Sequence, residues 1–595
     1  MSEIPLLWGA GSRKEALDLL CTLWSNSEGD VRDRLSDVLV AGPPEELLEH
    51  LPPAEREKSR DRRVFDRIAA LERIGVPPLS EALQVELARI IAEYPNWRLP
   101  EGEQAHFGSW TEVRSGPDTR HNISDLKLLS DQDLADALLN ERDMREGLLD
   151  AWRQLASTQP ERAIALLRQI NAQREHPPGD IVSHGIRGLR DAAKQPTPRK
   201  EVLSLMQSLP AMLDQSDVSS AMADFLEVAA SAQISATSDT SFWNVFDRTL
   251  AAAQLDPQNA EVTDDHNWVF LAINRPVGTL ATAFFSALFA RELRVGTSIP
   301  LDLRPRLEAL LRRDAPSHLL ARVIAASRLS YLFAVDPDWT QDNLLPSFDW
   351  EASELEAGAV WQGYAWQPRI DEKLWMALKP YFIDVFTRDR LQHLGEMGNY
   401  LAQILMLIGI EFGIDQIPRD AARNAIRAMP DQMRSAAVSW AASYLEQAKD
   451  DSGQPESDAA NPSRHPDVLW KQKVAPWLDR VWPAEPDLRS QSTAEQFALA
   501  AIATDKRFPE AVGALMPHFL VSRANEAIHS LAASRHPENH PRAVLNLINA
   551  LVDPDTRRFG AMDLQNILDR LSAADPQIVQ TAAFRTWHDR LRARQ

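Results

Sequence analysis

Helical periodicity recurs along almost the whole of this 595-residue chain. From Ser130 onward, segments with apolar residues three or four positions apart follow one another, and short connections that contain Pro, Asp, Ser or Gly join them. No segment combines the apolar–polar alternation of a half-buried strand with enrichment in Val or Ile. Gly is also scarce, at 23 residues, which argues against an all-β protein rich in tight turns. The pattern predicts an all-α protein.

The expected helices cannot bury their apolar faces alone, so they must stack against their neighbours. We find no exact repeat period in the sequence. Successive helices joined by short turns nevertheless favour antiparallel hairpins that stack on one another. We therefore expect an elongated α-solenoid of antiparallel helix pairs, similar in kind to HEAT or TPR repeats.

Irregular and polar stretches suggest where this long chain divides. An irregular segment from Tyr94 to Pro117 carries Trp97, Phe107 and Trp110, and a polar segment from 450 to 463 has no apolar periodicity. The expected organisation is an N-terminal helical unit at 1–117, a helical solenoid at 118–300, a Trp-rich helical domain at 301–449, a linker at 450–463 and a C-terminal helical domain at 464–595.

The charge balance limits the partners that we expect. Asp and Glu number 85 against 64 Lys and Arg, which gives a formal charge of −21. A net negative charge repels the phosphates of nucleic acids. The most basic run, Arg56 to Arg67, also contains Glu57, Asp61 and Asp66, so we interpret it as a solvated helix face. The single cysteine, Cys21, fits a reducing compartment. The most apolar stretches fall short of the roughly 20 residues of a membrane helix. We expect a soluble cytoplasmic protein without direct contact to nucleic acid or membrane.

Motifs that would indicate catalysis or cofactor binding are weak. Gly9-Ala10-Gly11-Ser12 lacks the preceding strand of a nucleotide loop, and His184 stands without a partner motif. His536 and His540 flank a Pro-containing turn, with His529 nearby. Because of this turn, the two imidazoles are not expected to lie on one helix face as metal ligands. Walker loops, nucleophile elbows and kinase motifs are missing. We therefore expect no catalytic residue, cofactor site or metal site, although an enzyme whose site is assembled from distant residues remains an alternative.

A Trp-rich stretch between Ala315 and Trp375 is the most specific local pattern. Trp, Tyr and Arg are favoured at binding hot spots, so one interpretation is an anchor surface for a partner. The other is a buried turn between helices, in which Gly363 permits close packing and Arg369 pairs with a carbonyl or a carboxylate. The candidate residues for partner binding or packing are Trp339, Trp350, Trp361, Gly363, Tyr364, Trp366 and Arg369.

Scattered motifs across most of the chain carry a family resemblance. They are Asn274-Arg-Pro276-Val-Gly278, Phe333-x-x-Asp-Pro-Asp-Trp339, Leu344-Leu-Pro-x-Phe348-Asp-Trp350, Trp361-Gln-Gly-Tyr-x-Trp366, the stretch from Trp470 to Pro483, and Phe508-Pro-Glu-Ala-Val512. Together they resemble the long helical region that follows the sirtuin domain in large bacterial antiviral-defence sirtuins. In that family the sirtuin domain depletes NAD when infection is sensed, and sensing or assembly is assigned to the helical part. The sirtuin domain is missing here, so no catalytic residue is carried over.

The resemblance implies a non-enzymatic sensor or scaffold in bacterial antiphage defence. Such a protein would bind a phage protein or an NAD-consuming effector. A general protein-interaction scaffold outside defence is the alternative, and an enzyme with a site that the sequence does not reveal is the third hypothesis.

Overall fold

The computed structural model describes residues 8, 13–49, 53–75, 77–95, 97, 123–141, 145–174, 177–194, 196–209, 216–232, 240–255, 267–452, 465–521, 524–552 and 561–592. These residues are helical or lie in turns and connections, and no β-strand occurs among them. The prediction of an all-α protein is confirmed. The chain forms two compact units, Met1–Thr119 and Arg120–Gln595, which are described separately.

The described residues of the first unit form four longer helices and one short 3-10 turn: α2 (Arg13–Asn26), α3 (Gly29–Ala41), η2 (Glu45–Leu47), α4 (Pro53–Ile74) and α5 (Glu81–Glu93). Its core is small and includes Trp8, Trp24, Phe65 and Leu87. Ser80 caps α5, because its hydroxyl accepts the N–H of Leu83. The indole of Trp24 donates to the carbonyl of Pro77 at 3.0 Å and so ties α2 to the start of that cap.

The second unit begins with helices that follow one another at short intervals. They are α6 (Ile123–Leu128), α7 (Asp131–Asn140), α8 (Arg145–Thr158), α9 (Pro160–Gln173), α10 (Gly179–Gly188), η4 (Leu189–Lys194), α11 (Pro196–Gln207), α12 (Ser216–Ala232), α13 (Thr240–Leu255), α15 (Trp268–Asn274), α16 (Pro276–Phe289) and α17 (Arg304–Leu310). Several of these helices begin with proline. A backbone N–H at this position has no acceptor within the helix, so proline, which lacks the N–H, costs no hydrogen bond there.

The Trp-rich stretch and the segment after it form the middle of the second unit. The elements there are α18 (His318–Ala326), α19 (Leu329–Val335), α20 (Pro337–Asn343), η7 (Leu345–Phe348), α21 (Glu354–Trp366), α22 (Glu372–Phe382), η8 (Ile383–Val385), α23 (Arg388–Leu394), η9 (Gly395–Met397), α24 (Gly398–Leu407), η10 (Ile408–Phe412), α25 (Arg419–Ala428) and α26 (Asp431–Ser452). Trp361 therefore lies in a helix, and the prediction of a turn at this position is wrong.

Shorter helices complete the second unit. They are α27 (Pro466–Leu469), η12 (Trp470–Val474), α28 (Ala475–Val481), η13 (Pro486–Leu488), α29 (Gln491–Ile502), α30 (Phe508–Leu515), η14 (Met516–His518), α31 (Asn525–Ala533), α32 (His536–Asn539), α33 (Pro541–Leu551), α34 (Ala561–Ala574), η15 (Pro576–Gln580) and α35 (Ala582–Arg592).

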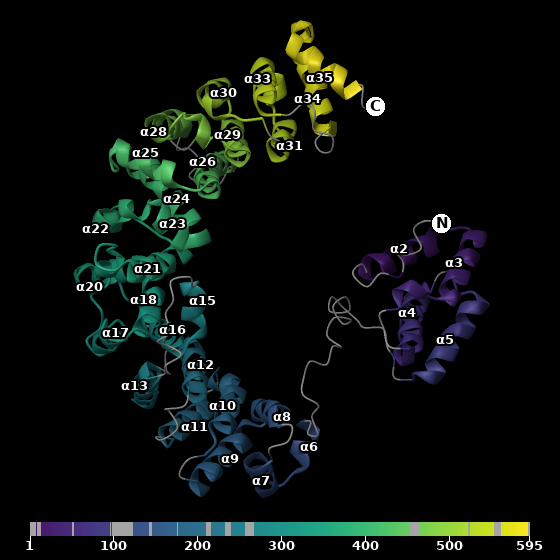
Figure 1. The fold of residues 1–595 in the computed structure, drawn as a ribbon, viewed down its shortest axis with the longest axis vertical. Helices are drawn as coiled ribbons and strands as arrows, with labels where there is room; N and C mark the ends of the chain where they lie inside the picture. Colours follow the sequence, from purple (N-terminus) through teal and green to yellow (C-terminus); the bar gives the residue numbers. More distant parts are fainter. Residues whose placement is uncertain are drawn as a thin grey trace. The chain divides into compact units, whose positions relative to one another are not determined.

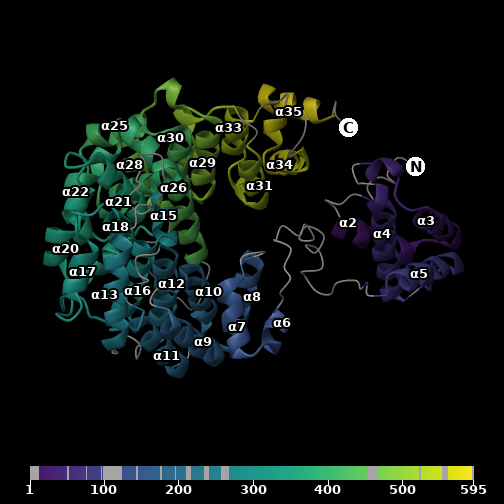
Figure 2. The ribbon, with the colours of Figure 1, turned by 60° about the horizontal axis from the view of Figure 1, so that its bottom comes forward.

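The helices of the second unit form two rows (Figure 1, Figure 2). In the first row each helix contacts the next along the series α8, α10, α12, α16, α18, α21, α24, α26, α29, α31 and α34. Helices such as α9, α11, α13, α25, α28, α30 and α33 lie in the second row. One large apolar core runs through the described part of this unit, from Leu126 to Leu591.

This continuity bears on the expected domain boundaries. The first unit ends at Thr119, close to the expected end at 117. Within residues 120–595 the described helices show no separate compact units at 300/301 or at 450–463, because α16 packs on α18 and α26 packs on both α27 and α29. The linker prediction is wrong at its start, since α26 continues to Ser452. Residues 453–463 lie outside the described residues.

Side-chain hydrogen bonds join positions of similar separation along the second unit. Trp152 donates to the carbonyl of Ile181, Gln362 to that of His393, Arg570 to that of Ala532 and Trp587 to the side chain of Asn549. These partners are 29, 31, 38 and 38 residues apart. Each such bond joins two helices that are not consecutive in the chain.

Candidate functional site

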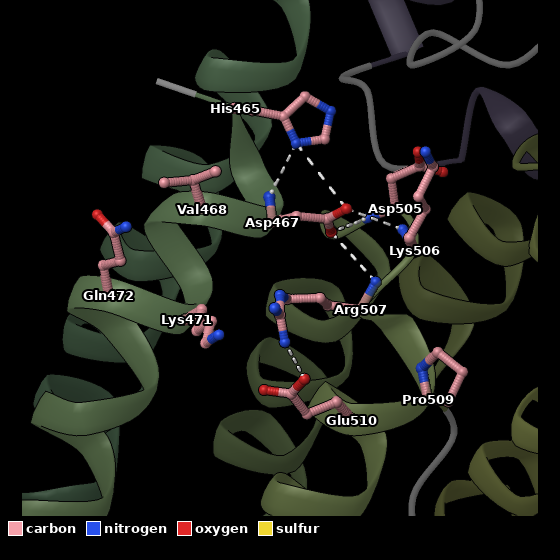
Figure 3. Close-up of a pocket in the computed structure, with 10 residues that line it drawn as sticks. All are labelled: His465, Asp467, Val468, Lys471, Gln472, Asp505, Lys506, Arg507, Pro509 and Glu510. Atoms are coloured by element: carbon pink, nitrogen blue, oxygen red, sulfur yellow. Dashed lines mark hydrogen bonds and ion pairs between the residues drawn. The ribbon is translucent and has the colours of Figure 1, made fainter. Parts of the chain in front are cut away.

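An open pocket lies between α27, η12 and the turn before α30, and charged side chains line it. Its cavity volume is about 980 Å³, and Figure 3 shows the residues that line it. They are His465, Asp467, Val468, Lys471, Gln472, Asp505, Lys506, Arg507, Pro509 and Glu510. Acidic and basic side chains are mixed in the lining, so the pocket does not favour a ligand of one charge.

Asp467 anchors one wall of this pocket. Its carboxylate accepts the backbone N–H groups of Asp505, Lys506 and Arg507 at 2.9, 3.1 and 3.2 Å (Figure 3). Consecutive N–H groups that point to one place form a nest, which commonly binds an anion. Here the buried carboxylate of Asp467 is that anion. The nest is therefore filled by the chain itself.

A metal ion is the cofactor that these residues could hold. Ligand atoms of His465, Asp467 and Asp505 all lie within 4.8 Å of one another. The Nδ1 atom of His465 accepts the N–H of Asp467 at 3.2 Å, and both carboxylate oxygens of Asp467 accept backbone N–H groups. Zinc requires deprotonated ligands that are free to coordinate it, and it favours a closed set of three or four. The donor set fits a helix cap and a turn anchor better than a metal centre.

The structure places the predicted Trp-rich residues in the core. Trp339, Trp350, Trp361 and Tyr364 are at most 5% exposed. The indole of Trp361 donates to the carbonyl of Phe348 at 3.1 Å, and its ring packs edge-on against the ring of Phe348. Only Trp366 is partly exposed, and Arg369 is exposed. The site residues therefore lie together around α21, and most of them serve packing.

Gly363 and Tyr364 show what this packing requires. A Cβ atom on Gly363 would lie 2.2 Å from the carbonyl oxygen of Val323, so only glycine allows α18 to approach α21 this closely. The Tyr364 hydroxyl donates to the carbonyl of Arg369 at 3.2 Å. Burial raises the pKa of Tyr364 well above its usual range, which keeps the ring neutral. The predicted packing role of Gly363 is confirmed, whereas Arg369 contributes its carbonyl to this contact.

Sequence reasoning missed Gln362, which lies between Trp361 and Gly363. Its side-chain oxygen accepts the N–H of Trp268 at 3.0 Å, and its side-chain nitrogen donates to the carbonyl of His393 at 2.7 Å. One buried amide thus joins α15, α21 and α23. The only indication of this role in the sequence is that Gln362 is a polar residue within a run of apolar helix residues.

The histidine motifs have structural partners. His184 lies in α10 and bonds through Nδ1 to the carbonyl of Asp180. His536 bonds through Nε2 to the carbonyl of Ile502 at 2.9 Å and stacks on Phe508. His529 lies 3.1 Å from a carboxylate oxygen of Asp563. Gly9 to Ser12 lie outside the described residues.

The basic run in α4 is less solvated than expected. Asp61 is buried and pairs with Arg60 at 2.9 Å and with Arg89 at 2.6 Å. Arg60 also donates to the carbonyl of Val40, and Arg63 donates to that of Trp8. The prediction of a solvated face is wrong for these side chains, which stabilise the first unit from within.

No single helix in the described part of the chain is long and apolar enough to cross a bilayer. Two pairs reach that composition only in combination, α15 with α16 and α18 with α19, and they are bent by 78° and 77°.

No protein-family model matches this chain, and no curated protein matches it. The function is therefore inferred from the residues of the chain and from the resemblance described above.

Proposed function

We propose that this chain is an α-solenoid scaffold that acts by binding a protein partner rather than by catalysis. The observation that carries the proposal is the series of first-row helices, each of which contacts the next from α8 to α34. Stacked helix pairs create extended surfaces that suit protein partners. The hydrogen bonds between residues 29–38 positions apart support a repeat of about one helix pair.

The resemblance to the helical region of antiviral-defence sirtuins supports a role for this scaffold in bacterial antiphage defence. In this proposal the cytoplasmic chain senses a phage protein or recruits an effector that consumes NAD. Its formal charge of −21 favours a basic protein surface over nucleic acid.

An affinity capture experiment tests this function. The tagged full chain is expressed in bacteria with and without phage infection, and bound proteins are identified by mass spectrometry. We expect a phage protein or an NAD-consuming effector that is recovered only, or far more strongly, from infected cells. NAD added to the purified chain alone should persist, and it should fall when the recovered effector is added.

Two outcomes would contradict the proposal at different levels. Recovery of the same housekeeping proteins with and without infection would remove the role in defence but leave a general scaffold. NAD consumption by the purified chain alone would contradict a function based on binding. A bait with a disrupted core, such as Gly363→Ala, is the control for proteins that bind any unfolded chain.

A further inference from the structure

A cleft lies in the first unit, between the end of α4 and the outer face of α5. Its cavity volume is about 450 Å³, and we call it the α4–α5 cleft. The lining residues are Leu71, Glu72, Gly75, Pro77, Pro78, Leu79, Gln84, Leu87, Ala88 and Ile91. One turn of an α-helix with its side chains occupies roughly 500 Å³, so the cleft has room for side chains of a partner but not for a whole helix.

One wall of the cleft is an apolar stripe of α5. The lining positions 84, 87, 88 and 91 are three or four residues apart, which places them on one face of the helix. Leu87 is buried in the core of the first unit, whereas Ala88 is exposed and Ile91 is 42% exposed. The stripe therefore offers apolar surface to a ligand beyond what the core already covers.

The turn that forms the opposite wall is held in place by other elements. The indole of Trp24 in α2 donates to the carbonyl of Pro77 at 3.0 Å, and the Ser80 hydroxyl donates to that of Ser36 in α3 at 2.9 Å. Gly75 ends α4 with a φ of +74°, which glycine adopts without strain. Two adjacent prolines fix φ in the turn. A wall that is already ordered loses little conformational entropy when a ligand binds.

The charge of the lining favours a cation. Glu72 is the only charged residue in it, and the Glu72 carboxylate has no hydrogen-bond or ion-pair partner among the described residues. The C-terminal end of the 22-residue helix α4 also lies here, and the last carbonyls of a helix carry partial negative charge. The N–H of Gly75 satisfies only the carbonyl of Leu71. Arg73 is the nearest basic residue in sequence, and it does not line the cleft.

The remaining polar side chain of the lining is an acceptor. Gln84 donates through Nε2 to the carbonyl of Leu79 at 3.0 Å, which leaves its side-chain oxygen for a ligand. An anion in the cleft would meet the Glu72 carboxylate and no basic lining residue. An uncharged apolar group would contact Ile91 but would leave Glu72 without a partner. A group that joins an apolar body to a cation is complementary to both.

We propose that the α4–α5 cleft binds an apolar side chain of a protein partner that has a lysine or an arginine beside it. The apolar side chain packs against Ala88 and Ile91, and the cation pairs with Glu72. This inference rests on the proposed scaffold function and names the chemistry of the partner surface. It also assigns the binding contact to the first unit.

Binding of three small probes to the full chain tests this chemistry. 4-Phenylbutylamine, 4-phenylbutanol and 4-phenylbutyrate share one apolar body and carry a positive, a neutral and a negative end at neutral pH. Saturation-transfer difference NMR measures each dissociation constant at about physiological salt, where surface charges are partly screened. We expect the amine to bind about two- to fivefold more tightly than the alcohol, the gain from one exposed ion pair, and the carboxylate to bind most weakly.

Variants then locate the contact. Glu72→Gln should abolish the preference for the amine and leave binding of the alcohol unchanged. Glu55→Gln changes an exposed acidic residue at the other end of α4 and should keep the preference. Ala88→Phe should fill the cleft and prevent binding of all three probes, whereas Ala82→Phe adds the same ring to α5 outside the lining. Far-UV circular dichroism and the thermal midpoint establish folding, and Glu72→Gln keeps the test valid if Ala88→Phe unfolds.

Four results would overturn the inference. They are no binding of the amine at millimolar concentration, equal affinity for the amine and the alcohol, an unchanged preference in Glu72→Gln, and undiminished binding of the captured partner to folded Ala88→Phe. In the last case the scaffold function would stand, because the partner would occupy another surface. Failure to capture any partner would contradict the scaffold function itself, whatever the probes show.

Discussion

Trp361 and Trp440 lie on first-row helices, yet their surroundings differ at the level of single residues. Trp361 is fully buried, and its indole N–H donates to the carbonyl of Phe348. Trp440 packs against the core as well but stays partly exposed. A buried Trp with a satisfied N–H serves packing, and an accessible one can anchor a partner. Gly363 permits the close approach of α18 and α21, and Gln362 joins α15 to α23. Substitutions at these two positions test both roles.

Gly363→Ala should destabilise the second unit by about 2–4 kcal/mol, because the added methyl group would overlap the backbone of α18 and force the two helices apart. Gly358 in the same helix is the matched control. A Cβ atom there would lie 3.7 Å from the Trp350 ring, so Gly358→Ala should be neutral or stabilise by up to about 1 kcal/mol through helix propensity. Chemical denaturation of both variants measures the difference, and equal midpoints would contradict the role of Gly363.

Gln362→Leu should cost about 1–3 kcal/mol, because it removes the acceptor of the buried Trp268 N–H and the donor to the carbonyl of His393. Hydrogen exchange gives the sharpest readout, since the amide of Trp268 should exchange much faster in the variant. Gln392→Leu changes an exposed residue of α23 and is the control. Unchanged protection of the Trp268 amide would show that Gln362 does not hold α15.

At the level of elements, side chains often complete the ends of helices that lie far away in the sequence. Asp467 at the start of α27 holds the turn that precedes α30, and Glu495 in α29 accepts the N–H of Glu526 at the start of α31. Such contacts satisfy the free N–H groups of helix ends and turns. The pocket around Asp467 is therefore a structural connection, which we call the joint, between α27 and the turn before α30. It nevertheless contains residue types that could bind a metal.

Asp467→Asn should destabilise the joint by about 1–3 kcal/mol, because a neutral amide presents one acceptor oxygen in place of two charged ones. Asp505→Asn should be nearly neutral, since only the N–H of Asp505 takes part in the joint. Adding Zn²⁺ or Mn²⁺ should not raise the thermal midpoint of the chain. A metal-dependent rise that both variants abolish would instead identify a metal centre.

At the level of the whole molecule, buried titratable groups couple stability to pH. Burial, aided by the Arg489 guanidinium, lowers the pKa of His518 to about 4. Burial is also the main reason that the pKa of His318 is lowered. Both rings are neutral in the folded chain, and the ordinary pKa of histidine in an unfolded chain is about 6.5.

Stability should therefore fall as the pH decreases from about 6.5 towards 4, because the unfolded chain then binds protons that the folded chain excludes. Above pH 6.5 these histidines contribute no pH dependence. The thermal midpoint measured across this range tests the sign. His518→Gln removes one titrating ring and should reduce the acid-induced loss. A midpoint that rises between pH 6.5 and 4 would contradict the prediction.

The sequence by itself determined that the chain is helical and that the Trp-rich stretch contains close packing at Gly363. Apolar periodicity, capping residues and proline positions act within a few residues, so a linear pattern records them. Tertiary structure alone decided which tryptophans are partly exposed, why Asp467 is unsuited to a metal and which helices Gln362 joins. These features depend on contacts between residues about 30 or more positions apart, or on which side of a helix its neighbours cover. Helix periodicity specifies an apolar face, and only the stacked neighbours determine which side chains remain accessible.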